Sequence, residues 1–195
     1  GVSAAEAAAM DPQQRLLLER GYEALHGAGL DKGSLMGSVT GVFIGAGVHD
    51  FEEVVKVSPA LSRNVYSATG SSASVLSGRL SFVLGLQGAC AAYDTACSAA
   101  LVANHAALRA LQLRECADAL VAGVSLYLAP GVSISFAGAG MTSARGACHT
   151  FDDRADGYAR GEACVGLALR ALPDVGSVMA SPLGSAVRCD GKSAS

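Results

Sequence analysis

An apolar run at residues 88–93 stops at a short polar turn, and a helix-forming stretch rich in small side chains follows at residues 98–113. Short apolar runs that give way to a longer helical pattern are typical of strand-to-helix units in α/β domains. The turn between the two segments holds Cys97. This unit predicts helices packed on a mostly parallel sheet, with Cys97 where a strand meets the start of a helix.

The remaining segments alternate in the same way. Asp11 can cap a helix whose first turn contains Pro12, and the continuous apolar run after Asp118 is typical of a strand buried on both faces. Helices are predicted over residues 12–26, 70–83 and 98–113, and strands over 39–44, 88–93, 118–126, 163–172 and 183–188, the last two as a hairpin.

Residues 119–141 contain no charged side chain and reach the length of about 20 residues that a membrane-spanning helix requires. Pro130 and Gly131 break the stretch in its middle, and three serines interrupt its apolar pattern. We therefore predict two short buried segments joined by a turn, and no membrane span.

The bulk composition argues against several classes of function. A formal net charge of −3 gives no basic surface for nucleic acid and no basic tract for an anionic membrane. The six cysteines lack paired metal-type spacing, so we expect the reduced thiols of an intracellular protein, cytoplasmic or imported into a plastid. Gly45 and Gly47 resemble the start of a dinucleotide fingerprint, but Asp50 occupies the third glycine position, and no nucleotide site is predicted.

Cys97 is the candidate nucleophile. A thiol at the start of a helix faces unpaired backbone N–H groups and the positive end of the helix dipole, and both favour the reactive thiolate. The small residues 98–100 let a substrate approach the backbone closely. The alternative is that Cys97 is an inert small apolar residue, which is the commoner role of a free cysteine.

The stretch YDTACSAALVA at residues 93–103 closely resembles the active-site segment of β-ketoacyl synthases, in particular the ketosynthase domains of modular polyketide synthases. Further blocks resemble the same family and run in family order. They are MDPQQRLLLE at residues 10–19, GVFIG at 41–45, GRLSFVLGL at 78–86, AGAGM at 137–141, TFD at 150–152, ADGYARGE at 155–162, GSAV at 184–187 and DGKS at 190–193.

The resemblance implies a thiolase-like layered α/β fold built from two related halves. Residues 1–195 would then be a partial ketosynthase domain, the N-terminal half without the first strand and without the C-terminal half. Half of a layered fold leaves an apolar face uncovered, so we expect the isolated piece to aggregate or to melt without cooperativity.

The resemblance also implies a chemistry and partners. Cys97 would take an acyl group as a thioester, and a malonyl-type extender would then lose carbon dioxide and attack it. Acyl substrates would arrive on the phosphopantetheine of an acyl carrier protein, with no cofactor bound by the domain itself. The complete protein would be a homodimer. The two histidines that the family needs for decarboxylation would lie outside this chain, so the chain alone is expected not to condense substrates.

The four histidines of the chain do not replace that pair. His105 lies eight residues after Cys97, or about 12 Å along one helix, which is too far for a direct hydrogen bond. His149 is expected to be an exposed loop residue, and His26 to interact with a helix C-terminus. No partner is predicted for His49.

Two other functions stay open. A non-catalytic scaffold or carrier-docking module is one, because Ala99 and Ala100 replace two serines of the family motif. A thiolase or an acyl hydrolase that shares the cysteine is the other. Leu101, Leu108 and Leu111 are expected to belong to the core rather than to an acyl tunnel.

Overall fold

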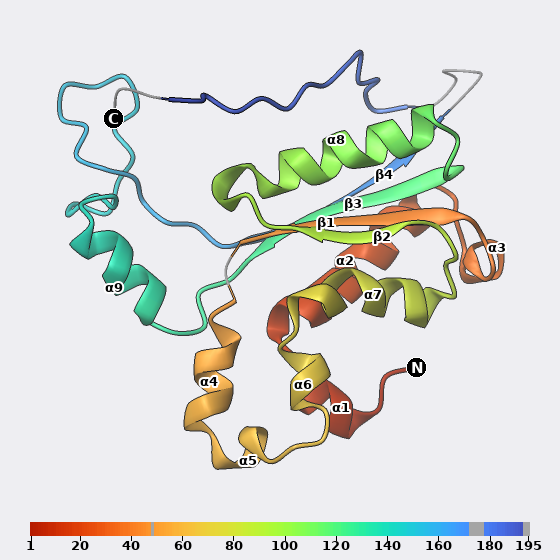
Figure 1. Cartoon of the computed structure of the whole chain (residues 1–195), viewed down its shortest axis with the longest axis horizontal. Coiled ribbons are helices and arrows are strands. Elements are labelled where there is room, and N and C mark those ends of the chain that lie inside the picture. The colour runs from red at the N-terminus through yellow and green to blue at the C-terminus, as the bar shows by residue number, and fades with distance from the viewer. Residues whose placement is uncertain (48, 172–177, 193–195) are drawn as a thin grey trace.

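A computed structural model of the chain describes residues 1–47, 49–171 and 178–192. Four strands form one sheet in the order β2-β1-β3-β4, with β1 parallel to both of its neighbours and β4 antiparallel to β3 (Figure 1). The strands are β1 (Thr40–Ala46), β2 (Cys90–Tyr93), β3 (Asp118–Ser125) and β4 (Ala163–Arg170).

Two helices cover one face of the sheet and one helix covers the other (Figure 1). They are α2 (Pro12–Gly27) and α7 (Ala73–Leu84) on one side and α8 (Ala99–Gln112) on the other. Side chains alternate across a strand, so Val42 and Ile44 of β1 pack with α2 and α7, whereas Phe43 packs with α8. The sheet is therefore buried between two apolar layers along β1 and β3.

Shorter helices surround this core. The helices α4, α5 and α9 project from the edge where β1 and β3 end (Figure 1). The remaining elements are α1 (Ala4–Ala8), α3 (Lys32–Leu35), α4 (Phe51–Val57), α5 (Pro59–Ser62), α6 (Ser67–Gly70), the 3-10 helix η1 (Ala96–Ser98) and α9 (Gly131–Gly138).

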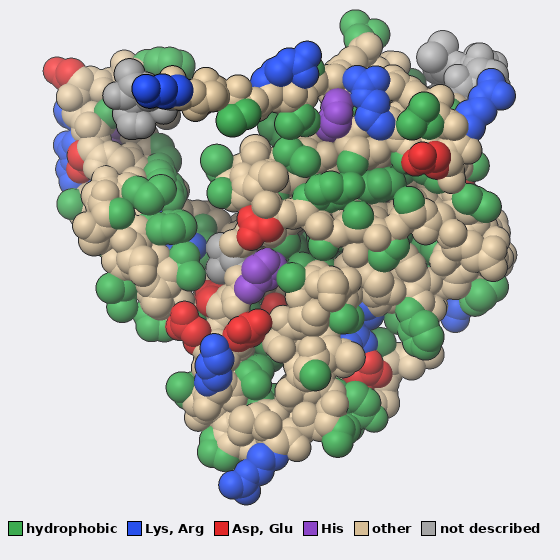
Figure 2. Space-filling model, viewed as in Figure 1, with side chains coloured by type: hydrophobic (Ala, Val, Ile, Leu, Met, Phe, Trp, Pro, Cys, Tyr) green, Lys and Arg blue, Asp and Glu red, His purple; other side chains and the backbone are tan. Residues whose placement is uncertain are grey.

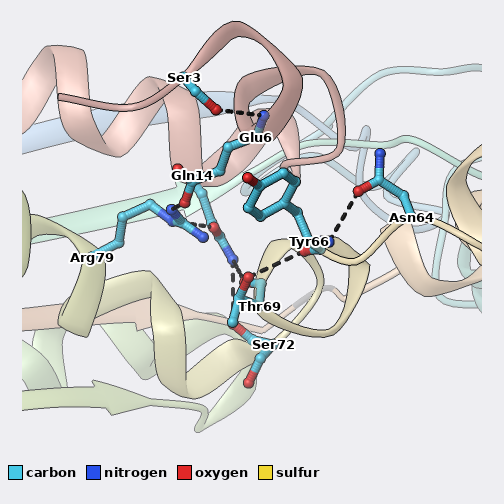
Figure 3. Close-up of polar contacts among 8 residues, drawn as sticks. All are labelled: Ser3, Glu6, Gln14, Asn64, Tyr66, Thr69, Ser72 and Arg79. Atoms are coloured by element: carbon cyan, nitrogen blue, oxygen red, sulfur yellow. Dashed lines mark hydrogen bonds and ion pairs between the residues drawn. The ribbon is translucent and has the colours of Figure 1, made fainter.

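A polar network joins α1, α2 and α7 (Figure 3), on the side of the sheet opposite α8 (Figure 1). The buried guanidinium of Arg79 forms an ion pair with Glu6, and its Nε donates to Oε1 of Gln14 at 2.8 Å. Nε2 of Gln14 in turn donates to the carbonyl of Thr69 at 3.0 Å. The second glutamine of the MDPQQR block thus links α2 to α7 and to Thr69 and accepts a hydrogen bond from the buried guanidinium, while Glu6 pairs its charge.

The structure confirms most of the predicted elements. Helix α2 begins at Pro12, and Oδ1 of Asp11 accepts the N–H of Gln13 at 2.7 Å as the expected cap. Strands β1, β2 and β3 and helix α8 occupy the predicted positions within two residues at each end. The helix predicted from residue 70 instead begins at Ala73, because residues 67–70 form the separate helix α6.

The prediction of a strand at residues 183–188 is wrong, and so is the hairpin. The strand predicted at 163–172 forms as β4, with Leu172 outside the described residues, but the later segment pairs with no strand where it is described. It crosses over α8, where the Ser185 hydroxyl lies 2.8 Å from Nδ1 of His105 and the Ser185 carbonyl accepts from Arg109 at 2.9 Å (Figure 1). Alternating apolar residues favour an extended chain, but they do not determine which strand or helix that chain contacts.

The charge-free stretch at residues 119–141 divides as predicted into two segments, β3 and α9, with Pro130 as the N-cap residue of the helix. Burial is correct for β3 and wrong for α9, which has no buried residue; Ile134, for example, is 67% exposed. Within the described ranges, no helix is both long and apolar enough to cross a membrane.

The α8 side of the sheet leaves apolar side chains uncovered. Leu101 of α8 is 73% exposed, which contradicts its predicted place in the core, while Leu111 is buried and Leu108 is half-buried. Val165 and Leu167 of β4 are also exposed. The face formed by α8 and β4 is therefore only partly covered by the described residues.

Candidate active site

Cys97 lies in η1, the single turn that joins the end of β2 to the start of α8. We predicted Cys97 directly before the helix; in the structure it lies within a 3-10 turn that precedes α8. Cys97 is exposed and its thiol is free. Ala96, just before it, has a φ of 53°, a left-handed conformation that is unfavourable for a residue with a side chain. A strained strand-to-helix turn of this kind presents a nucleophile at the edge of a sheet.

Side chains of the turn itself hold its shape. Oδ1 of Asp94 accepts the backbone N–H of Ala96 at 3.0 Å. On the other side of Cys97, the Ser98 hydroxyl donates to the carbonyl of Thr95 at 2.9 Å and lies 2.8 Å from the Thr95 hydroxyl. These hydrogen bonds fix the backbone on both sides of the cysteine.

Two glycines of the central strands lie against the start of α8, Gly45 in β1 and Gly123 in β3. A β-carbon on Gly45 would overlap the backbone of Ala100, and one on Gly123 would lie 3.0 Å from the Ala100 methyl group. Gly47, directly after β1, lies beside the turn instead, where a β-carbon would be 3.2 Å from Oδ1 of Asp94. Packing therefore requires a glycine at Gly45, and the small side chain of Ala100 has a structural reason.

The helix dipole at the N-terminus of α8 favours negative charge beside Cys97. Ser98, the N-cap residue, makes no side-chain hydrogen bond to the first turn. The 3-10 turn takes up the first backbone donors instead, because the N–H groups of Ser98 and Ala99 donate to the carbonyls of Thr95 and Ala96.

No hydrogen bond joins Cys97 to a histidine within the described residues, and the surroundings of the histidines differ from the prediction in two cases. His105 contacts Ser185, and His26 lies in the last turn of α2 with its ring 5.8 Å from that of Tyr22. His149 is a loop residue, but it is half-buried rather than exposed. His49, for which no partner was predicted, has Nε2 3.9 Å from Oδ2 of Asp94.

Asp50 anchors the loop that follows β3. Its side chain is buried, and Oδ2 accepts the N–H groups of Leu128 and Ala129 at 2.8 and 3.0 Å. Oδ1 has no hydrogen-bond partner among the described residues. The N-cap of α4 thereby fixes the entry to α9. Sequence reasoning missed this role because the contact joins segments far apart in the chain.

Two charged residues of the block at 155–162 contact the loop after β3 and helix α9. The Arg160 guanidinium lies 3.7 Å from the ring centre of Tyr127 and 5.2 Å from that of Phe136. Glu162 accepts the N–H of Tyr127 at 2.7 Å. Cation–π contacts of this kind tie α9 to the end of β3.

Acidic groups gather near this edge of the sheet, and Figure 2 shows several of them around a histidine above α4. Burial raises the pKa of the Asp11 carboxyl, and the charge of Asp50 adds to the increase, while hydrogen bonds from Gln13 and the proximity of His49 oppose it. No group of three or more metal-ligating side chains occurs among the residues that the structure describes.

The fold and the turn define a thiolase-like α/β protein that presents a cysteine at the start of a helix. The family model for the N-terminal domain of β-ketoacyl synthases matches residues 1–174, and the chain belongs to that family.

Similar proteins are polyketide synthases. The chain is 44% identical over 99% of its length to a phenolphthiocerol/phthiocerol polyketide synthase of Mycobacterium tuberculosis and spans 13% of that protein. It is 46% identical over 99% of its length to polyketide synthase GfsE of Streptomyces halstedii and spans 5% of it. The ketosynthase from module 6 of the Bacillus subtilis bacillaene synthase superposes on 86% of this chain with a TM-score of 0.77 at 36% identity, and the chain covers 28% of it.

Proposed function

We propose that this chain is the N-terminal part of a ketosynthase domain in which Cys97 carries the growing acyl chain. The observation that supports this most directly is the exposed thiol of Cys97 on a strained turn at the start of α8, in a member of the β-ketoacyl synthase family. The proposal extends to a longer protein because the chain covers 28% of the similar ketosynthase structure and leaves the face of α8 and β4 only partly covered.

The chemistry has two stages. The Cys97 thiolate attacks the carbonyl carbon of an acyl thioester held on the phosphopantetheine of an acyl carrier protein. The phosphopantetheine thiolate leaves, and the acyl group stays on Cys97. A malonyl-type extender then loses carbon dioxide, and the resulting carbanion attacks the Cys97 thioester. A carbon–carbon bond forms, and the Cys97 thiolate is released.

The backbone supplies electrostatic help for both stages. Each attack places negative charge on the former carbonyl oxygen, and the N–H of Cys97 is the nearest candidate donor to it. The strained turn holds that N–H and the thiol in one fixed relation, so that no reorganisation is needed when charge develops. Decarboxylation is assigned to residues outside the chain, in keeping with the family resemblance; His26, His49 and His105 have other neighbours.

A homodimer is part of the proposal. Strand β2 is one of the two edge strands of the sheet, β4 being the other, and it pairs only with β1 in the described structure. Its free edge leaves backbone groups open to another strand, and a second copy would satisfy them. Sedimentation of the complete ketosynthase tests this: a dimer mass is expected, and a monomer at micromolar concentration would contradict it.

Labelling tests the central claim. The complete ketosynthase is treated with a thioester-based acyl probe, and the modified peptide is identified by mass spectrometry. We expect acylation at Cys97, and its loss in Cys97→Ala. Cys90 is also exposed and serves as the matched control, so Cys90→Ala is expected to keep full labelling. Acylation that persists in Cys97→Ala would leave a non-catalytic scaffold as the better interpretation.

A further inference from the structure

We infer that Asp94 and His49 are positioning residues for Cys97, an inference that rests on the proposed acylation of this cysteine. Neither residue needs to touch the substrate. Asp94 acts on the backbone of the turn, and His49 acts on Asp94. The two residues come from different segments, the end of β2 and the loop after β1, and the fold brings them together beside the nucleophile.

Asp94 lies three residues before Cys97 and holds the strained residue between them. Its Oδ1 accepts the Ala96 N–H at 3.0 Å, and Ala96 has a φ of 53°. A left-handed alanine is unfavourable and persists only where the surroundings enforce it. Since the hydrogen bond depends on the direction of the Ala96 N–H, the carboxylate selects the backbone conformation that presents Cys97.

Gly47, which directly follows β1, lies beside this hydrogen bond. A β-carbon there would be 3.2 Å from Oδ1 of Asp94 and 3.5 Å from the α-carbon of Ala96. The Asp94 side chain is half exposed, and the backbone at Gly47 limits the positions of Oδ1 on its covered side.

His49 lies beside the other carboxylate oxygen. Its Nε2 is 3.9 Å from Oδ2 of Asp94, which is beyond hydrogen-bonding distance but within the reach of an ion pair. The two oxygens thus have separate neighbours, the Ala96 N–H for Oδ1 and the His49 ring for Oδ2, and together these favour one rotation of the carboxylate. The other titratable groups near His49 are Asp50, next to it in the chain, and Asp11, on which the charge of His49 acts.

The test measures acylation of Cys97 in the complete ketosynthase by a hexanoyl thioester of N-acetylcysteamine. Asp94→Ala removes the acceptor, and we expect the rate of acylation at saturating thioester to fall about tenfold or more, with little change in KM, because misplacing a reacting group costs rate. Asp94→Asn keeps an oxygen acceptor and should retain most of the rate. His49→Gln should give a smaller loss, of about threefold.

Controls separate positioning from unfolding. Glu52→Gln removes one partner of an exposed ion pair on α4 and should leave the rate unchanged. The buried thiol of Cys116 reports folding, since its alkylation by iodoacetamide should stay slow in every variant. An Asp94→Ala protein with the wild-type rate, or Asp94→Asn as slow as Asp94→Ala, would overturn the inference. Wild-type protein that is not acylated at Cys97 would instead overturn the proposed function.

Discussion

Gly45 of β1 lies directly beneath Ala100 of α8, with no room for a side chain between strand and helix. The strand and the helix therefore meet backbone to backbone in the first turn of α8, directly after the Cys97 turn. This close approach sets the position of the start of α8 on the sheet, and with it the end of the Cys97 turn.

Substituting Gly45 tests how far that contact sets the site. Gly45→Ala should displace the start of α8, lower the rate of Cys97 acylation by about tenfold or more, and reduce the yield of soluble ketosynthase. Gly78→Ala is the matched control, because a β-carbon at Gly78 in α7 meets nothing within 4 Å. Equal acylation rates in the two variants would show that the close approach does not position the nucleophile.

The buried Arg79 network should matter for stability rather than chemistry. Glu6→Ala leaves the guanidinium with Gln14 alone, and we expect a loss of about 2 kcal/mol in the free energy of unfolding. Glu23→Ala, which breaks the exposed pair with Arg20, should cost less than about 0.5 kcal/mol. Urea unfolding of the complete ketosynthase measures both, and equal losses would contradict the role given to Glu6.

The burial of Asp11 predicts a pH-dependent effect. Its pKa is raised above the ordinary value of 3.8, so the folded state carries a cost for ionising this group at neutral pH. As the pH falls through the raised pKa, the folded protein takes up the proton before the unfolded chain does. The destabilisation of the folded state by the ionised carboxyl therefore decreases, and it is absent once the pH is well below 3.8.

Asp11→Asn isolates that effect, because asparagine also caps a helix but does not ionise. The free energy of unfolding of the variant should exceed that of wild type by most near neutral pH, and the difference should shrink as the pH approaches 3.8. The comparison also cancels the pH dependence that Asp152 contributes with the opposite sign, because Asp152 is the same in both proteins and the Arg154 side chain lowers its pKa. An advantage that is constant with pH, or that grows in acid, would contradict the assignment.

Local patterns predicted those elements whose signals lie within a few residues. The Asp11–Pro12 start of α2 and the uncharged run of β3 are examples, and the motif around Cys97 identified the candidate nucleophile. The prediction of a strand at residues 183–188 was wrong because the alternation of apolar and polar residues does not specify which element an extended segment will contact. The partner of Asp94 was missed for a related reason, since His49 reaches it only after β1 and β2 have paired.

The uncovered apolar face leads to an expectation for the isolated chain. Leu101 of α8 and Val165 and Leu167 of β4 are more than half exposed. Large exposed apolar patches are rare on soluble monomers, so the 195-residue chain expressed alone should aggregate or melt without a cooperative transition. Light scattering and thermal melts followed by circular dichroism measure this. A soluble monomer with a sharp two-state melt would contradict it.

Arg160 provides the last expectation, because α9 has no buried residue and depends on side-chain contacts at one end. Removing the guanidinium in Arg160→Ala takes away the contacts with Tyr127, Phe136 and Ser133 together. We expect α9 to separate from the end of β3, and limited proteolysis of the complete ketosynthase to cut faster between residues 131 and 162.

Arg160→Lys keeps the charge without the planar group and should be cut at an intermediate rate. Arg154→Ala removes an exposed arginine that pairs only locally with Asp152, so it should leave the cutting rate near that of wild type. If Arg154→Ala and Arg160→Ala are cut equally fast, the Arg160 contacts do not hold α9 against the end of β3.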